Sequence, residues 1–122
     1  MTGPDHDLLR FVASSFRSVW ALELLLVLKS EERVWSREEL VATLRASELV
    51  VSKALDSLLA AGLASVDAEG ARYMPVSEEV ARNVERAESL YAAKPDAVRR
   101  RIVSSSAADL AAFADAFRLR KE

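Results

Sequence analysis

Two serines near the middle of the chain mark the starts of two short helices, and this feature constrains the fold most. Ser36 is followed three residues later by Glu39, the spacing of a capping box, so a helix is expected to begin near Ser36. Ser47 can cap the next helix, which means that the first one stops near Arg45. Four apolar residues then share one face of the second helix: Val51, Ala54, Leu55 and Leu58. The sequence therefore predicts two helices joined by a tight turn.

A small hairpin is expected after these two helices. Gly62 fits the left-handed cap that ends the second helix. Two strand candidates follow, Leu63 to Asp67 and Ala71 to Met74, with Gly70 between them to supply a positive φ. Pro75 then closes the hairpin.

The segment before Ser36 predicts one long first helix, from Leu8 to Lys29. Its apolar residues recur at helical spacings of three, four and seven: Leu8, Phe11, Val12, Val19, Leu22 and Leu26. Ser30 to Arg33 is a polar connector, and Val34 with Trp35 forms a short extended piece.

Further helices are predicted after the hairpin. Ser77 opens a helix that Pro95 interrupts, and Asp96 can cap a short basic helix from Ala97 to Val103. Ser104 to Ser106 form a polar break, after which a capping box precedes an apolar helix, Leu110 to Phe117. The chain thus reads as one domain over 1–122, with an N-terminal helix at 8–30, two helices and a hairpin at 34–75, and C-terminal helices at 77–120.

Composition excludes most enzyme classes. A chain of 122 residues that is 51% hydrophobic and 30% charged is expected to be a soluble globule with one core. It has no cysteine, and its one histidine, His6, lies near the start, so thiolate or histidine metal sites and a histidine-based triad are not expected. No glycine-rich phosphate loop is present. We expect no catalysis and no cofactor. Nothing at the N-terminus reads as a signal peptide, and the longest apolar run is Leu24 to Leu28, so a cytoplasmic location without membrane contact is predicted.

The predicted order of three helices, a two-strand hairpin and further helices is that of a winged helix-turn-helix. Residues 35–64, WSREELVATLRASELVVSKALDSLLAAGLA, resemble the DNA-binding segment of GntR-like and MarR-like bacterial transcription regulators. The resemblance lies in a polar start, a leucine-rich helix, a short turn ending in serine, a V-S-x-A-L-x-x-L helix, and a G-L step into the wing. It implies a mainly helical winged fold and a dimeric DNA-binding regulator of transcription.

In the resembled families the third helix enters the major groove, and its first turn and outward face meet the DNA. Carried over to this sequence, the candidate positions on that helix are Ser47, Glu48, Val50, Ser52 and Lys53. Arg45 in the turn and Arg72 in the wing are further candidates. A phosphate contact would justify the strain of a positive φ at Arg45, but ordinary backbone geometry with a solvated side chain is the alternative. Arg99, Arg100 and Arg101 form a second basic cluster, which can also be simply solvated.

Charge and exposed apolar residues leave a second function open. Residues 36–75 carry four cations and six acids, a net charge of −2, where a DNA-binding surface is normally positive. Leu49 and Val50 cannot both face the core if Val51 and Leu55 do, so the start of this helix could dock a protein instead; the alternative is that Leu49 packs under the preceding helix. Trp20 and Trp35 are expected in the core or in a dimer contact. A homodimer is predicted through the helices Leu8 to Lys29 and Leu110 to Phe117.

Overall fold

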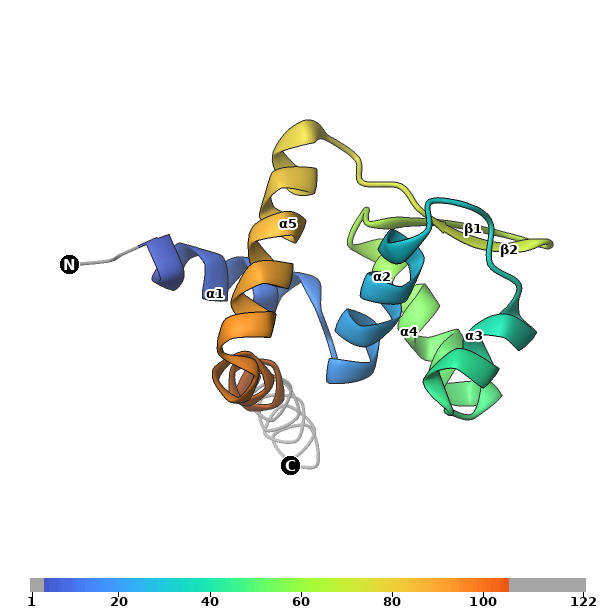
Figure 1. Cartoon of the computed structure of the whole chain (residues 1–122), viewed down its shortest axis with the longest axis horizontal. Coiled ribbons are helices and arrows are strands. Elements are labelled where there is room, and N and C mark those ends of the chain that lie inside the picture. Colours follow the sequence, from blue (N-terminus) through green and yellow to red (C-terminus); the bar gives the residue numbers. More distant parts are fainter. Residues whose placement is uncertain (1–3, 106–122) are drawn as a thin grey trace, which may run out of the picture.

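The computed structural model describes residues 4–105, and they form a mainly helical domain with one small antiparallel hairpin (Figure 1). The predicted fold class, a winged-helix arrangement with flanking helices, is confirmed. The elements in chain order are α1 (Pro4–Ser15), α2 (Val19–Ser30), α3 (Arg37–Leu44), α4 (Glu48–Ala60), β1 (Ala64–Asp67), β2 (Gly70–Tyr73) and α5 (Glu78–Ala93). Residues 95–105 are also helical and are called helix 95–105 below.

Both predicted serine caps are confirmed. The Ser36 hydroxyl oxygen accepts a hydrogen bond from the Glu39 N–H at 3.1 Å, and the Glu39 carboxylate accepts one from the Ser36 N–H at 2.9 Å. The Ser47 hydroxyl oxygen accepts from the Val50 N–H at 3.1 Å. These bonds satisfy backbone donors that the first turns of α3 and α4 would otherwise leave unpaired. They also fix the length of the turn between the two helices at residues 45–47.

The prediction of one long first helix is wrong, because the chain bends by 96° between α1 and α2. Ser18 begins α2 by accepting a hydrogen bond from the Ala21 N–H at 3.1 Å. Phe16 is buried at the bend, where its ring meets the Phe11 ring edge-on with 6.4 Å between centroids. Helical spacing is not interrupted at this point, because the seven residues from Val12 to the start of α2 equal two helical turns. The apolar pattern alone therefore could not reveal the bend.

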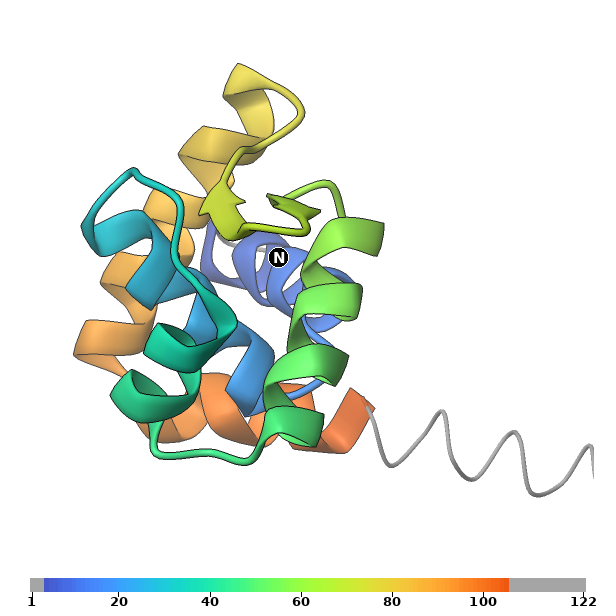
Figure 2. The same cartoon turned by 90° about the vertical axis from the view of Figure 1, so that its right-hand side faces the viewer.

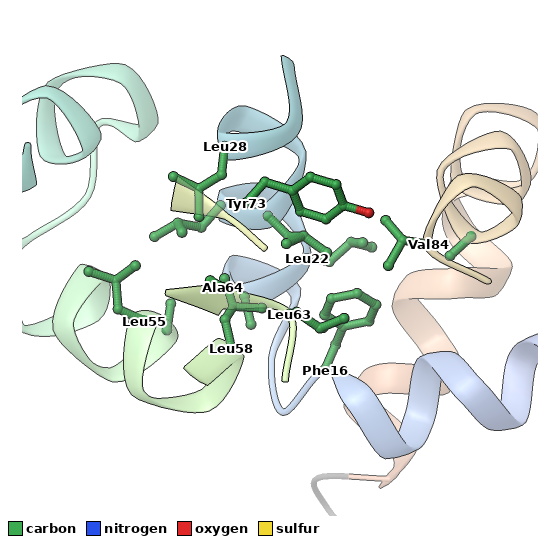
Figure 3. Close-up of a cluster of buried hydrophobic side chains, with 14 of the residues drawn as sticks. Phe16, Leu22, Leu28, Leu55, Leu58, Leu63, Ala64, Tyr73 and Val84 are labelled. Atoms are coloured by element: carbon green, nitrogen blue, oxygen red, sulfur yellow. The ribbon is translucent and has the colours of Figure 1, made fainter. Parts of the chain in front are cut away.

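The core is built around α2, which contacts α3, α4 and β2. Its buried side chains are Ala21, Leu22, Leu24, Leu25 and Leu28. Figure 3 shows Leu22 and Leu28 of α2 in one buried cluster with Leu55 and Leu58 of α4, and Val84 of α5 at the other end of the cluster. Apolar burial on this scale is the main stabilising contribution in a small domain.

The hairpin is joined to the segment before α3 by an isolated bridge. Ala64 pairs with Tyr73 and Asp67 with Gly70 in the antiparallel register. Trp35 and Ala71 exchange two backbone hydrogen bonds, at 2.7 and 2.9 Å. Gly70 has a φ of +147°, and a Cβ at this position would overlap the Trp35 carbonyl group. The predicted positive φ of Gly70 is confirmed, and the bridge adds a second reason for glycine there.

The C-terminal prediction is partly wrong. Ser77 caps α5 as predicted, but the next helix already includes Pro95, so Asp96 lies in its first turn and not at its cap. Proline suits the first helical position because the N–H it lacks would be unpaired there anyway. Ser104 and Ser105 are still helical, so the predicted break does not begin at Ser104. Val98 and Ile102 are fully buried on one face, and their packing holds this helix. The predicted helix Leu110 to Phe117 lies outside the described residues.

Candidate nucleic-acid interface

The candidate surface is the exposed side of α4 together with the turn before it. α3 and α4 pack against each other and lie at the face that Figure 2 presents. Six residues of α4 are exposed: Glu48, Leu49, Lys53, Asp56, Leu59 and Ala60. The opposite side of α4 is buried in the core, as the positions Val51, Ala54, Leu55 and Leu58 predicted. The helix therefore presents three charged and three apolar side chains to solvent.

Arg45 ends α3 in the left-handed conformation, with φ 54° and ψ 43°. The N–H of Ala46 donates to the Val41 carbonyl at 3.3 Å, the bond expected of a Schellman motif. Glycine is the usual residue at such a position, because an L-residue there costs about 1–2 kcal/mol. Of the two alternatives for Arg45, the structure selects the strained one, and the arginine side chain is exposed to solvent.

Ser52 is bound to a residue that the sequence did not single out as a site residue. The Arg37 guanidinium donates to the Ser52 hydroxyl oxygen at 2.8 Å, which links the first turn of α3 to α4. A cation in the first turn of a helix opposes the helix dipole, so an arginine at this position needs another reason. The contact with α4 offers such a reason, and an unfavourable position in the helix dipole is a sequence signal that could have indicated Arg37.

The first turn of α4 brings together three other predicted residues. The Ser47 hydroxyl oxygen is engaged in the helix cap, and Glu48 is exposed where the helix dipole favours a negative charge. Val50 is half-buried, whereas Leu49 is 64% exposed. The alternative in which Leu49 packs under α3 is therefore wrong. An apolar side chain stands in solvent at the start of this helix.

Arg72 lies on β2 of the wing, opposite Ser65 in the register, and is exposed. At the hairpin turn the Asp67 carboxylate accepts hydrogen bonds from the N–H groups of Glu69 and Gly70, at 2.9 and 3.2 Å. The acid at the wing tip thus holds the turn.

Part of the acidic charge of residues 36–75 is paired with a cation just outside that range. The Arg33 guanidinium holds the two carboxylate oxygens of Glu39 at 3.2 and 3.0 Å. These bonds lower the pKa of Glu39. The same guanidinium lies 3.9 Å from the centre of the Trp35 ring. Arg33 also lies 3.6 Å from the Glu31 carboxylate, and residues 31–75 carry five cations and eight acids, so this unit stays net negative.

The second basic cluster does not form one surface. Arg99 pairs with Asp96 at 3.5 Å and lies 5.4 Å from the centre of the Tyr91 ring, whereas Arg101 shares a surface hollow with Arg10 and Arg17. This hollow has a volume of about 410 Å³. It joins α1, the bend and helix 95–105, a juxtaposition that the sequence prediction missed because these segments are far apart along the chain.

Comparison of the chain with protein-family models, with curated proteins and with solved structures found no match. Among residues 4–105, no group of three or more histidine, aspartate or glutamate side chains is placed to hold a metal ion. In the same part of the chain no single helix has the length and apolar character to cross a membrane, although α1 and α2 together meet those two criteria as a bent pair.

Proposed function

We propose that this chain is a winged-helix DNA-binding protein that regulates transcription as a homodimer. The observation that carries the proposal is the backbone of Arg45, which is strained, exposed and next to the helix that reads DNA in proteins of this arrangement. Strained residues persist where the surrounding structure holds them, and they concentrate at functional sites. A guanidinium at this turn can bind a phosphate, which glycine could not do.

Two further exposed cations on α3 and α4 support phosphate binding. Lys53 is exposed on α4, and Arg37 is fixed in place by its bond to Ser52. One hydrogen bond to a hydroxyl leaves most of the five N–H donors of a guanidinium for a phosphate. In this proposal Ser52 positions Arg37 and does not read a base itself. Arg72 adds a contact from the wing.

The dimer part of the proposal depends on a smaller surface than the sequence suggested. α2 supplies most of its apolar side chains to the core of its own chain. Within residues 4–105, the predicted Leu8 to Lys29 surface therefore reduces to the exposed Trp20 and to partly buried apolar side chains of both helices: Leu8, Leu9, Phe11, Val19, Leu26 and Val27. Light scattering at tens of micromolar protein tests it, since a monomer mass would contradict the dimer.

A salt-dependent titration with random-sequence duplex DNA tests the DNA part. Each phosphate contact contributes about 0.9 to the slope of log K against log salt. Arg37→Ala and Lys53→Ala should each weaken binding and flatten the slope by about this amount. Arg82→Ala, which removes an exposed cation from α5, is the matched control and should leave the slope unchanged. Absence of binding at low salt, or equal effects of all three variants, would contradict DNA binding through α4.

A protein-interaction module without DNA binding is the second candidate, and the exposure of Leu49 favours it. A protein partner would cover this leucine, so Leu49→Asp should abolish that interaction. DNA binding should survive Leu49→Asp apart from the effect of one added negative charge. If the parent chain fails to bind duplex DNA, the second candidate replaces the first.

A further inference from the structure

A second surface hollow lies between the start of α2 and the end of α3. The inference drawn from it is separate from the proposed DNA-binding function. Its volume is about 410 Å³, and its lining residues are Val19, Trp20, Glu23, Thr43 and Leu44. We propose that this hollow binds a small organic cation, an ammonium or amidinium group carried on an apolar body.

Glu23 supplies the charge that selects a cation, because among residues 4–105 it is the only ionisable side chain in the lining. The Tyr91 hydroxyl, on α5, donates a hydrogen bond of 2.6 Å to one oxygen of the Glu23 carboxylate. No lysine or arginine of the described residues forms an ion pair with Glu23. The carboxylate is therefore held in place from one side while its charge is left for a ligand.

The hydrogen bond from Tyr91 persists over the whole neutral range. Burial first, and then the bond to Glu23, raise the pKa of Tyr91 by more than the neighbouring Arg99 guanidinium lowers it, so the hydroxyl keeps its proton. A neutral donor fixes the position of the carboxylate without cancelling its negative charge. Tyr91 is thus a positioning residue for Glu23.

Trp20 supplies the second recognition element. It lies three residues before Glu23 on α2, which places both side chains on the same side of the helix. Trp20 is 43% exposed, whereas Trp35 is only 7% exposed, so the core does not account for Trp20. An indole face attracts cations more strongly than the other aromatic rings do. An indole next to a carboxylate is a combination that favours an organic cation.

The remaining lining residues define the rest of the ligand. Val19 and Leu44 are apolar and only partly buried, so they can cover a hydrocarbon or aromatic body. The Thr43 hydroxyl can accept a hydrogen bond from an N–H of the cation. A planar amidinium on an aromatic ring can interact with all of these side chains, whereas an anion would be repelled by the negative charge of Glu23.

The two tryptophans make the test specific. Benzamidine is titrated into the full-length protein at constant ionic strength, and the two indole N–H signals are followed by heteronuclear NMR. The Trp20 signal should shift and saturate with a dissociation constant on the order of 1 mM, as expected for a small fragment. The Trp35 signal should remain in place, because its indole N–H donates to the Glu31 carbonyl at 3.0 Å, away from the hollow.

Benzamide, a neutral molecule of nearly the same shape, is the matched ligand control and should bind at least tenfold more weakly. Glu23→Gln keeps the size of the side chain, and it should weaken benzamidine at least fivefold and leave benzamide unchanged. Equal binding of benzamidine and benzamide to the parent would overturn the proposal, as would a parent Trp20 signal that does not move or an undiminished affinity for benzamidine in Glu23→Gln. The experiment contains no DNA, so its outcome is independent of the proposed DNA binding.

Discussion

Replacing Arg45 with glycine should stabilise the fold and weaken DNA binding in the same variant. The left-handed backbone of Arg45 costs about 1–2 kcal/mol for an L-residue, and glycine removes this cost. Glycine in turn adds about 0.5–1 kcal/mol of entropy to the unfolded chain. The side chain of Arg45 is exposed, so little packing is lost. The difference ranges from zero to about 1.5 kcal/mol, so the central expectation is a gain of about 0.75 kcal/mol in the free energy of unfolding.

Urea denaturation measures this gain directly, and the melting temperature should rise by about 2–4 °C for a chain of this size. The same protein should bind duplex DNA more weakly, with a salt slope lower by about 0.9. Arg45→Asn is the first control, because asparagine tolerates the left-handed region without a charge, and it should reproduce the loss of DNA affinity. Arg45→Lys should retain most of the affinity. A less stable Arg45→Gly variant would refute the strain argument, and unchanged DNA affinity would refute the phosphate contact.

Three further predictions concern the core, the hairpin and alkaline pH. Gly70→Ala should cost about 2–4 kcal/mol in urea denaturation, because its Cβ would overlap the Trp35 carbonyl; stability equal to the parent would show that the bridge can move aside. Leu55→Ala should cost about 2–5 kcal/mol at its fully buried site, and a melting temperature within a degree of the parent would contradict that placement. The pKa of Lys29 is raised by its bond to Glu88 at 2.9 Å, and burial raises the pKa of Tyr73 and of Tyr91. Each group therefore contributes stability that is complete below its unfolded-state pKa and is lost as pH rises through the folded value, so thermal melts should show stability falling above about pH 10. Constant stability up to pH 11.5 would contradict these shifts.

The sequence predicted those parts of the fold that depend on residues close together along the chain. The serine caps and the turn glycine act over two to four residues, so their chemistry is visible in the order of residue types. The bend after α1 was missed because Ser18 caps α2 inside an apolar pattern that continues at helical spacing on both sides. The bend is evident only in the structure, where the axes of α1 and α2 differ by 96°.

The candidate site was less predictable because its contacts join residues that are far apart along the chain. Arg37 and Ser52 are 15 residues apart, and Glu23 and Tyr91 are 68 apart. No local pattern relates the members of such pairs, since only the packing of the helices brings them together. The sequence also left two conformations of Arg45 possible. Local propensity favours the unstrained conformation, whereas the short turn set by the Ser47 cap of α4 favours the left-handed one.

The bridge between Trp35 and Ala71 has a consequence for folding. Its two hydrogen bonds close a loop that contains α3, α4 and most of the hairpin. Such a contact forms late, since the entropy of closing the loop must be offset by helices that are already packed. Once formed, it joins the wing to the entry of α3, so we expect the two segments to open together. The backbone amides of Trp35 and Ala71 should therefore exchange their hydrogens with solvent at a common opening free energy, although 36 positions separate them along the chain.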